Sequence, residues 1–203
     1  MTDDPMAQRR QLRDRLRQAR RAVTPASRNH AADGLARQLT SLAFAPSSGP
    51  VAGYWASDGE VSLEPWRARL PGSCTYCLPV LGDDGQLRFA PYGDGTPLRP
   101  NRFGIPEPDL PVSRWLRPID MALVVLPLVG FDLEGERLGM GGGWYDRSFA
   151  FRHGRPGSPW MVGAAFDLQA VPRLPAQAWD VPLDAVCTES ITLDFRPSHR
   201  SPE

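Results

Sequence analysis

Ala122-Leu123-Val124-Val125-Leu126 is an unbroken apolar run that stands before a long loop ending in Gly139–Gly143. An uninterrupted apolar run of this length is typical of a strand buried on both faces of a parallel sheet. A helix is predicted to begin near Trp144, directly after the glycines. A buried strand that leads into a helix is the repeating unit of an α/β fold, so this segment sets the fold class.

Helices and strands are also predicted on both sides of this segment. Apolar residues recur at helical spacing from Met6 to Val23, at Leu12, Leu16, Ala19 and Val23. Thr24 followed by Pro25 has the pattern of an N-cap and first helical position, so we expect two N-terminal helices within residues 6–43. Further strands are predicted at Val51–Trp55, Cys74–Leu78, Leu87–Ala90, Met161–Ala165 and Ala185–Thr188, with a short helix from Ser62 to about Leu70.

Strands that alternate with helices predict an α/β sheet with helices on its faces. The chain has 203 residues, which suits a single domain over 1–203 with its core at 51–194. Pro79 is expected to stop the strand that begins at Cys74, and residues 92–118 are expected to be mostly loop. The tail at 195–203 is polar and is expected to be frayed.

The basic residues of this chain are all arginines, and the formal net charge is +0. The absence of lysine excludes a P-loop lysine, a Schiff-base lysine and a lysine nucleophile. Any phosphate must therefore be held by arginine, backbone N–H groups or a metal ion. A neutral charge balance gives no reason to expect nucleic acid or a membrane surface as a partner.

Three cysteines are too few for a disulfide scaffold, and they favour a reducing cytoplasmic location. Cys74 and Cys77 have the spacing of half a zinc site or a redox pair. In a strand they would face opposite sides, so we interpret them as ordinary structural cysteines. The longest apolar run, Met121–Phe131, has about half of the roughly 20 residues that a membrane helix needs.

The glycine-rich stretch Gly135–Arg147 is the most informative part of the sequence for function. Glycines before a helix leave backbone N–H groups free to hold phosphate, although the same glycines could serve only a tight turn. The spacing fits neither a P-loop nor a dinucleotide fingerprint. Asp146 follows the glycines, where a carboxylate could hold Mg²⁺ beside phosphates or could simply stabilise the start of the helix.

At these residues the chain resembles the 5-formyltetrahydrofolate cyclo-ligase family, also called the methenyltetrahydrofolate synthetases. The resemblance runs from about Arg9 to Glu189, and its parts occur in the order that is typical of the family. Those parts are Arg9–Arg13, Trp55 with Ser57–Val61, Phe103–Pro108, Asp120, Arg137–Arg147, Gln169, Asp180, Asp184 and Thr188-Glu189.

The resemblance implies a fold similar to a three-layer α/β sandwich with a largely parallel central sheet and an N-terminal helical segment. It implies an ATP- and Mg²⁺-dependent cyclisation of 5-formyltetrahydrofolate to 5,10-methenyltetrahydrofolate through a phosphorylated formyl group, with release of ADP and phosphate. We expect a monomer that acts on these two substrates in the cytoplasm, with neither nucleic acid nor a membrane as partner.

The resemblance also assigns roles to individual residues. ATP binding is implied for Arg9, Arg10, Gln11, Leu12 and Arg13, and for Arg137, Leu138, Gly139, Met140, Gly141, Gly142, Gly143, Trp144 and Tyr145. Folate binding is implied for Trp55, Glu60, Met140, Gly141, Gly142, Gly143 and Trp144, and Mg²⁺ binding for Asp146 and Asp180. The chain departs from the commonest family residues at Arg9, Met140 and Trp144, but no departure removes a needed charge or donor.

Two other classes of function compete with this interpretation. The first helix carries a run of arginines, which is usually a solvated face and could alternatively bind nucleic acid. The run lacks the interleaved aromatic residues that stack on bases. A sugar-phosphate isomerase or a CoA transferase on a similar scaffold would need no ATP, so nucleotide dependence separates those enzymes from a cyclo-ligase.

Overall fold

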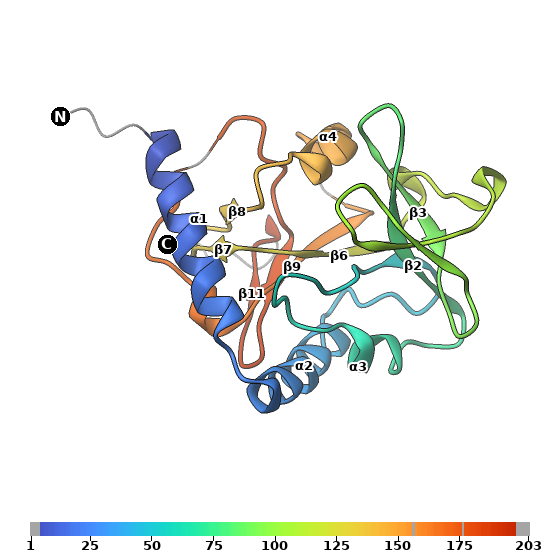
Figure 1. The fold of residues 1–203 in the computed structure, drawn as a ribbon, viewed down its shortest axis with the longest axis horizontal. Helices are drawn as coiled ribbons and strands as arrows, with labels where there is room; N and C mark the ends of the chain where they lie inside the picture. The colour runs from blue at the N-terminus through green and yellow to red at the C-terminus, as the bar shows by residue number, and fades with distance from the viewer. Residues whose placement is uncertain (1–4, 156, 176, 198–203) are drawn as a thin grey trace.

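The computed structural model describes residues 5–155, 157–175 and 177–197 (Figure 1). Two helices open the chain, α1 at Pro5–Arg21 and α2 at Pro25–Thr40. Thr24 is the N-cap of α2, and its hydroxyl accepts a hydrogen bond from the Ser27 N–H at 3.2 Å. The predicted N-cap and the proline at the first helical position are therefore confirmed.

A sheet of seven strands forms the centre of the molecule, in the order β11-β10-β9-β6-β1-β2-β3. The strands from β10 through β9, β6 and β1 to β2 run parallel, and the edge strands β3 and β11 are antiparallel to their neighbours. Their bounds are Gly49–Ala52 (β1), Cys74–Leu81 (β2), Leu87–Pro91 (β3), Leu123–Pro127 (β6), Trp160–Ala164 (β9), Ala185–Cys187 (β10) and Thr192–Asp194 (β11).

Helices cover both faces of this sheet. Figure 1 shows α2 and α3 (Glu64–Arg67) on one side and α4 (Trp144–Phe149) on the other. Each side has its own apolar core, and β6 supplies both. Leu123 and Val125 point into the α2 side, whereas Val124 and Leu126 point into the α4 side. The α/β sandwich with a largely parallel sheet is therefore confirmed, as is the buried strand at its centre.

Short elements complete the fold. Residues 92–118 are mostly loop as expected, with one small antiparallel pair, β4 (Leu98–Pro100) and β5 (Pro106–Pro108). The hairpin of β7 (Gly130–Phe131) and β8 (Arg137–Leu138) follows β6 and packs beside α1. Single 3-10 turns occur at Val112–Arg114, Pro118–Asp120, Ala150–Arg152 and Asp167–Gln169 (η1 to η4).

Pro79 does not end its strand, because β2 continues to Leu81. The Gly53 N–H donates to the Cys77 carbonyl, so the backbone N–H and C=O groups of Cys77 point toward β1. By alternation, the backbone nitrogen of Pro79 also points to that edge of β2. The strand β1 has already ended at Ala52, so no partner strand lies there to need the missing N–H of the proline. Antiparallel pairing with β3 continues undisturbed on the other side.

Two other sequence-based expectations are wrong in detail. The helix expected over 62–70 is limited to α3, because the N–H groups of Arg69 and Leu70 bond three residues back and tighten the chain into turns. The start of the tail is not frayed. The Phe195 N–H donates to the Asp184 carbonyl at 2.9 Å, and the Arg196 guanidinium lies 4.2 Å from the ring centroid of Phe44. The rest of the tail, residues 198–203, lies outside the described residues.

Cys74 and Cys77 lie on opposite faces of β2, as the strand prediction requires. Cys74 packs against the core on the α2 side and Cys77 belongs to the core on the α4 side. Burial raises the pKa of the Cys77 thiol to about 12. Both therefore fit the interpretation as packing residues. Among the described residues, no helix combines the length and apolar character that crossing a bilayer requires.

Gly34 tests how closely α2 packs on the turn after β10. A Cβ on Gly34 would lie 2.4 Å from the backbone oxygen of Glu189. We expect Gly34→Ala to lower the free energy of unfolding by about 1–3 kcal/mol, because backbone cannot yield as a side chain can. Ordinary helix propensity predicts a gain of about 1 kcal/mol instead. Urea unfolding distinguishes the two signs, with Gly72→Ala, whose Cβ meets nothing within 4 Å, as the control.

Candidate functional site

A cavity of about 840 Å³ opens where β1, β2 and β6 end. Tyr54 and Trp55 follow β1, Leu81 closes β2, and Pro127 closes β6. Parallel strands place their carboxyl ends at one edge, and ligands of open α/β sheets bind there. The other walls come from α1, from residues 101–107, from the loop before α4 and from residues 177–180. A smaller cavity of about 370 Å³ beside Tyr76 and Tyr92 contains none of the sequence-predicted site residues.

The glycine loop, Gly139–Gly143, connects β8 to α4 and lines the cavity along its whole length. Gly141 has a φ of +90° and Gly143, at the N-cap of α4, has a φ of +62°. Residues with a side chain rarely adopt these angles, so both positions require glycine. The helix begins at Trp144 as predicted, and Trp144, Tyr145 and Asp146 line the same cavity.

The two predicted metal ligands lie on one wall of the cavity, each beside a buried arginine. The Arg137 guanidinium donates to Asp146 Oδ1, and the Val181 N–H donates to the same oxygen at 3.1 Å. Arg9 Nη2 donates to Asp180 Oδ2 at 3.3 Å. Burial raises the pKa of Asp180, Arg9 opposes this effect, and the nearby charge of Asp146 adds to it. The Asp146 carboxylate is therefore close enough for its charge to affect Asp180.

This pair of carboxylates fits Mg²⁺ in the chemistry of its donors. Mg²⁺ prefers hard oxygen ligands and commonly takes one or two carboxylates, completing its shell with phosphate oxygens and water. In the part of the chain that the structure describes, no group of three or more His, Cys, Asp or Glu side chains is arranged to hold a metal ion. An ion at Asp146 and Asp180 would accordingly need phosphate or water ligands as well.

Glu60 lines the same cavity, in a turn that we call the Glu60 turn (Ser57–Glu60). Its Oε2 accepts from the Ser57 N–H at 2.9 Å, and its Oε1 lies 3.7 Å from Arg20 Nη1. Burial raises the pKa of Glu60, and the bonds from Ser57 and the charge of Arg20 offset this only in part. The prediction of Glu60 in a polar turn after a buried strand is confirmed, and its carboxylate faces the cavity.

Aromatic residues also line the cavity, among them Trp55, Phe103 and Trp144. Trp55 packs edge-on against Tyr92, with ring centroids 6.1 Å apart. Phe103 packs edge-on against Trp144 of α4, with ring centroids 6.5 Å apart, although Phe103 is 59% exposed. The cavity therefore offers flat apolar surfaces near a buried carboxylate, which suits a planar heteroaromatic ring with N–H donors.

Residues 101–107 form a wall supported by Asn101, which was not singled out in the sequence, and by Glu107, which lies in the Phe103–Pro108 segment but was given no role. Glu107 is buried, and it accepts from the Leu81 N–H at 3.0 Å and from Asn101 Nδ2 at 2.8 Å. Asn101 Oδ1 in turn accepts from the N–H groups of Phe103 and Ile105. An asparagine before glycine and proline indicates such a turn, but the bond between Glu107 and Leu81 of β2 cannot be read from local sequence.

Helix α1 brings only part of the predicted arginine segment to the cavity. Arg9 and Arg13 line it, and Arg13 Nε donates to the Gly139 carbonyl at 2.8 Å. Arg10 and Gln11 are exposed and point away from it, while Leu12 packs on a small apolar cluster of Leu16, Val129, Leu138, Val171 and Leu174. Leu138 is likewise buried in that cluster and does not line the cavity.

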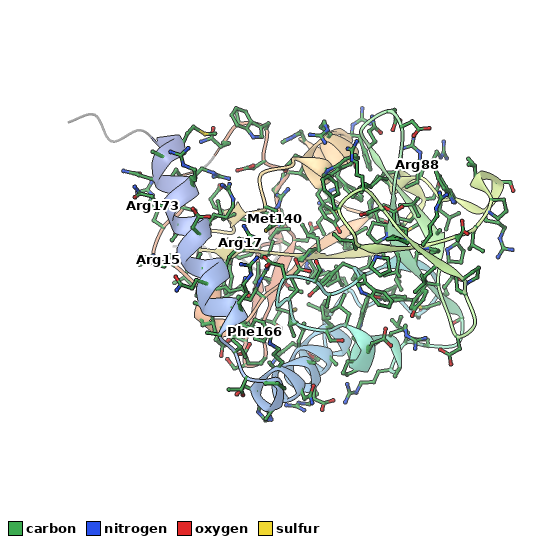
Figure 2. The ribbon with its side chains drawn as sticks, viewed as in Figure 1. Arg15, Arg17, Arg88, Met140, Phe166 and Arg173 are labelled. Carbon is green, nitrogen blue, oxygen red and sulfur yellow. The ribbon has the colours of Figure 1, made fainter. Side chains whose placement is uncertain are left out.

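The arginine run of α1 is not a uniformly solvated face. Arg9 is 7% exposed and Arg20 is 1% exposed, so the expected solvation is wrong for both. In Figure 2, Arg17 lies on the side of α1 toward Met140, and Arg15 lies on the opposite side. Arg17 and Met140 both line the cavity. Charges that are used internally leave fewer for a phosphate backbone, which disfavours the nucleic-acid alternative.

Comparison with known proteins points to one family. The model of the 5-formyltetrahydrofolate cyclo-ligase family matches residues 5–189. The 5-formyltetrahydrofolate cyclo-ligase of Escherichia coli K12 is 38% identical over 182 residues, which cover 86% of this chain and 97% of that protein. The protein of the same name from Haemophilus influenzae is 35% identical over 178 residues, covering 86% and 94%. The NMR structure of Aquifex aeolicus 5,10-methenyltetrahydrofolate synthetase is similar with a TM-score of 0.80 and 30% identity, covering 96% of each chain.

Proposed function

Because the chain belongs to the 5-formyltetrahydrofolate cyclo-ligase family, we propose that it converts 5-formyltetrahydrofolate to 5,10-methenyltetrahydrofolate, using ATP and Mg²⁺. One observation carries the proposal. A single cavity brings together the Glu60 turn, the glycine loop and the acidic pair of Asp146 and Asp180. These three groups are suited to bind a folate, a triphosphate and a divalent cation, respectively, within the same cavity.

The reaction needs little covalent participation from the protein. The formyl oxygen is a poor leaving group, so ATP transfers its γ-phosphoryl group to that oxygen and leaves as ADP. N10 of the folate then attacks the activated carbon, the carbon–oxygen bond breaks, phosphate departs and N10 loses its proton. Such phosphoryl transfer depends on positioning and on stabilisation of charge, which the arginines and backbone N–H groups of this cavity can supply.

Each wall of the cavity has a role in this proposal. Glu60 would accept two hydrogen bonds from the pterin ring, beside Trp55. The glycine loop, Arg9 and Arg13 would hold the triphosphate, with Arg137 orienting Asp146. Asp146 and Asp180 would hold Mg²⁺, which when bound neutralises phosphate charge. We propose further that the protein works as a monomer in the cytoplasm, with neither nucleic acid nor membrane as partner.

Purified protein mixed with 5-formyltetrahydrofolate is expected to form the methenyl product only when ATP and Mg²⁺ are both present. One ADP should form per product, since each turnover transfers one phosphoryl group. The near-ultraviolet absorbance of the methenyl compound and a coupled ADP assay measure the two quantities. Product formation that proceeds equally without ATP would refute the proposed function.

Asp146→Asn should lower kcat by at least about tenfold, because losses of this order follow even when outer partners of a metal site are removed. Asparagine keeps an oxygen that can accept from the Val181 N–H, so the fold should survive. Activity titrated against Mg²⁺ measures the effect. Asp94→Asn, at a side chain 96% exposed, is the control. An unchanged Mg²⁺ dependence in Asp146→Asn would remove this residue from the metal site.

Glu60→Gln should weaken binding of 5-formyltetrahydrofolate by about tenfold or more, because a bond to a charged acceptor contributes about 1.5–3 kcal/mol. ATP affinity should change little, since the contacts of Glu60 are with Ser57 and Arg20 and none is with the glycine loop. Calorimetric titration of each ligand alone separates the two effects, with Glu64→Gln, 56% exposed on α3, as the control. Parental affinity for the folate in Glu60→Gln would show that Glu60 is not a folate ligand.

A further inference from the structure

Asp58 is the meeting point of the Glu60 turn and helix α1. Its carboxylate accepts from Arg17 Nε at 2.8 Å and from Arg20 Nη2 at 2.9 Å, and it also pairs with Arg21. Its backbone carbonyl accepts from Arg20 Nε at 3.1 Å. Burial raises the pKa of Asp58, but the hydrogen bonds from Arg17 and Arg21 outweigh burial and leave the pKa below its usual value. The carboxylate is therefore a charged anchor for three arginines.

The backbone at Asp58 is also unusual. Its φ is +49°, the one positive φ outside glycine among the described residues. Aspartate tolerates this left-handed conformation better than most residues, but the surroundings must hold it there. Gly59 follows with a φ of +80°, and a Cβ on it would lie 3.2 Å from the Arg21 Cα. The turn is thus pressed directly against the last turn of α1.

Arg20 connects α1 to Glu60, the residue that is proposed to bind the folate. Its Nη1 donates to the Leu128 carbonyl at 3.1 Å and lies 3.7 Å from Glu60 Oε1. A guanidinium that is 1% exposed must have its charge and donors satisfied within the protein. Asp58, Glu60 and Leu128 together supply those partners, so the position of Glu60 depends on that of α1.

The N-terminal part of α1 makes comparable contacts with the part of the cavity that is proposed to bind nucleotide and Mg²⁺. Arg9 bonds to Asp180 and to the Pro175 carbonyl, and Arg13 bonds to the Gly139 carbonyl of the glycine loop. Apolar contacts of α1 are few, because Leu16 is its only fully buried apolar side chain among the described residues. Polar contacts at both ends therefore add to the packing of Leu12 and Leu16 in fixing where this helix lies.

We propose that Asp58 is a positioning residue that couples the two halves of the site through α1, so that nucleotide and folate each strengthen the binding of the other. The inference rests on the proposed function, because it requires both ligands. A nucleotide that holds Arg9, Arg13 and the glycine loop in place also holds α1 in place. The contacts of Asp58 with the arginines of α1 then hold the Glu60 turn, and with it Glu60, in position. By linkage the folate must tighten nucleotide binding by the same factor.

The test measures this coupling directly. A non-hydrolysable ATP analogue with Mg²⁺ and 5-formyltetrahydrofolate are titrated by calorimetry, each alone and each in the presence of the other. In the parent protein each ligand should tighten the other by about tenfold, within the usual range for such coupling. In Asp58→Asn, which keeps the shape but loses the charge, the factor should fall below about twofold while each affinity measured alone changes less.

Two further variants keep the test decisive. Arg21→Gln removes one contact to Asp58 at a side chain that is 57% exposed, so it should fold and reduce the factor to about threefold. Arg15→Gln, on the outer side of the same helix, should keep the parental factor. Thermal unfolding checks that each variant is folded. A merely structural role would lower stability or both separate affinities and leave the coupling factor unchanged.

The outcomes separate the inference from the function on which it rests. Failure of the parent protein to bind both ligands would defeat the proposed function and the inference together. If the parent binds both ligands without mutual strengthening, or if Asp58→Asn and Arg21→Gln retain the parental factor, only the role of Asp58 is overturned.

Discussion

Parallel pairing of β1 with β2 and with β6 is the constraint on which the candidate site depends. Ala52 at the end of β1 lies opposite Cys77 on one side and Val124 on the other, so the three strands run toward the same edge. The chain must leave the sheet at that edge after each strand. After β1 it continues to α3 on one face of the sheet, after β2 it turns back into β3, and after β6 it continues through β7 and β8 to α4 on the other face, which leaves a hollow between these segments. The segments that follow these three strands form the walls of the cavity or pack against the elements that do.

The helix that closes this hollow carries charge where a helix normally carries leucine. Arg9 and Arg20 are buried, and each is paired with a carboxylate and with backbone carbonyls. A planar guanidinium can serve several acceptors in fixed directions, which an ammonium group on a flexible stem does less well. The lack of lysine in the chain is therefore matched by the geometry of α1, where single side chains connect elements far apart in the sequence.

Much of the scaffold could be predicted from sequence because its signals are local. The apolar run at 122–126, the Thr24-Pro25 cap and the glycines before Trp144 each act within a few residues, and each structural prediction is confirmed. The orientation of α1 was harder to predict. Helical spacing included Ala19 in the buried stripe, but Ala19 is exposed and Arg20 takes its place. The partner of Arg20 is Asp58, in a turn that no helix pattern can anticipate.

The site residues likewise include some that the sequence located and some whose role depends on partners far along the chain. Family resemblance located the Glu60 turn, the glycine loop and the acidic pair, and the fold brings all three to one cavity. Asn101 and Glu107 were not recognised as supports, because Asn101 acts through Glu107 and Glu107 in turn bonds to Leu81 on another strand. Arg10 and Gln11 adjoin Arg9 in sequence but point to the other side of the helix, so proximity along the chain overstated their closeness to the cavity.

Because α1 makes few apolar contacts, we expect it to move on a shorter time scale than the sheet and α2. The sheet and α2 bury large continuous apolar surfaces, so their opening requires loss of most of the core. Undocking of α1 breaks mainly polar contacts, which water can replace, and it uncovers a wall of the cavity while the strands keep their register. We expect motions of this helix to be far more frequent than unfolding of the sheet, so that ligands enter and products leave over a scaffold that stays rigid.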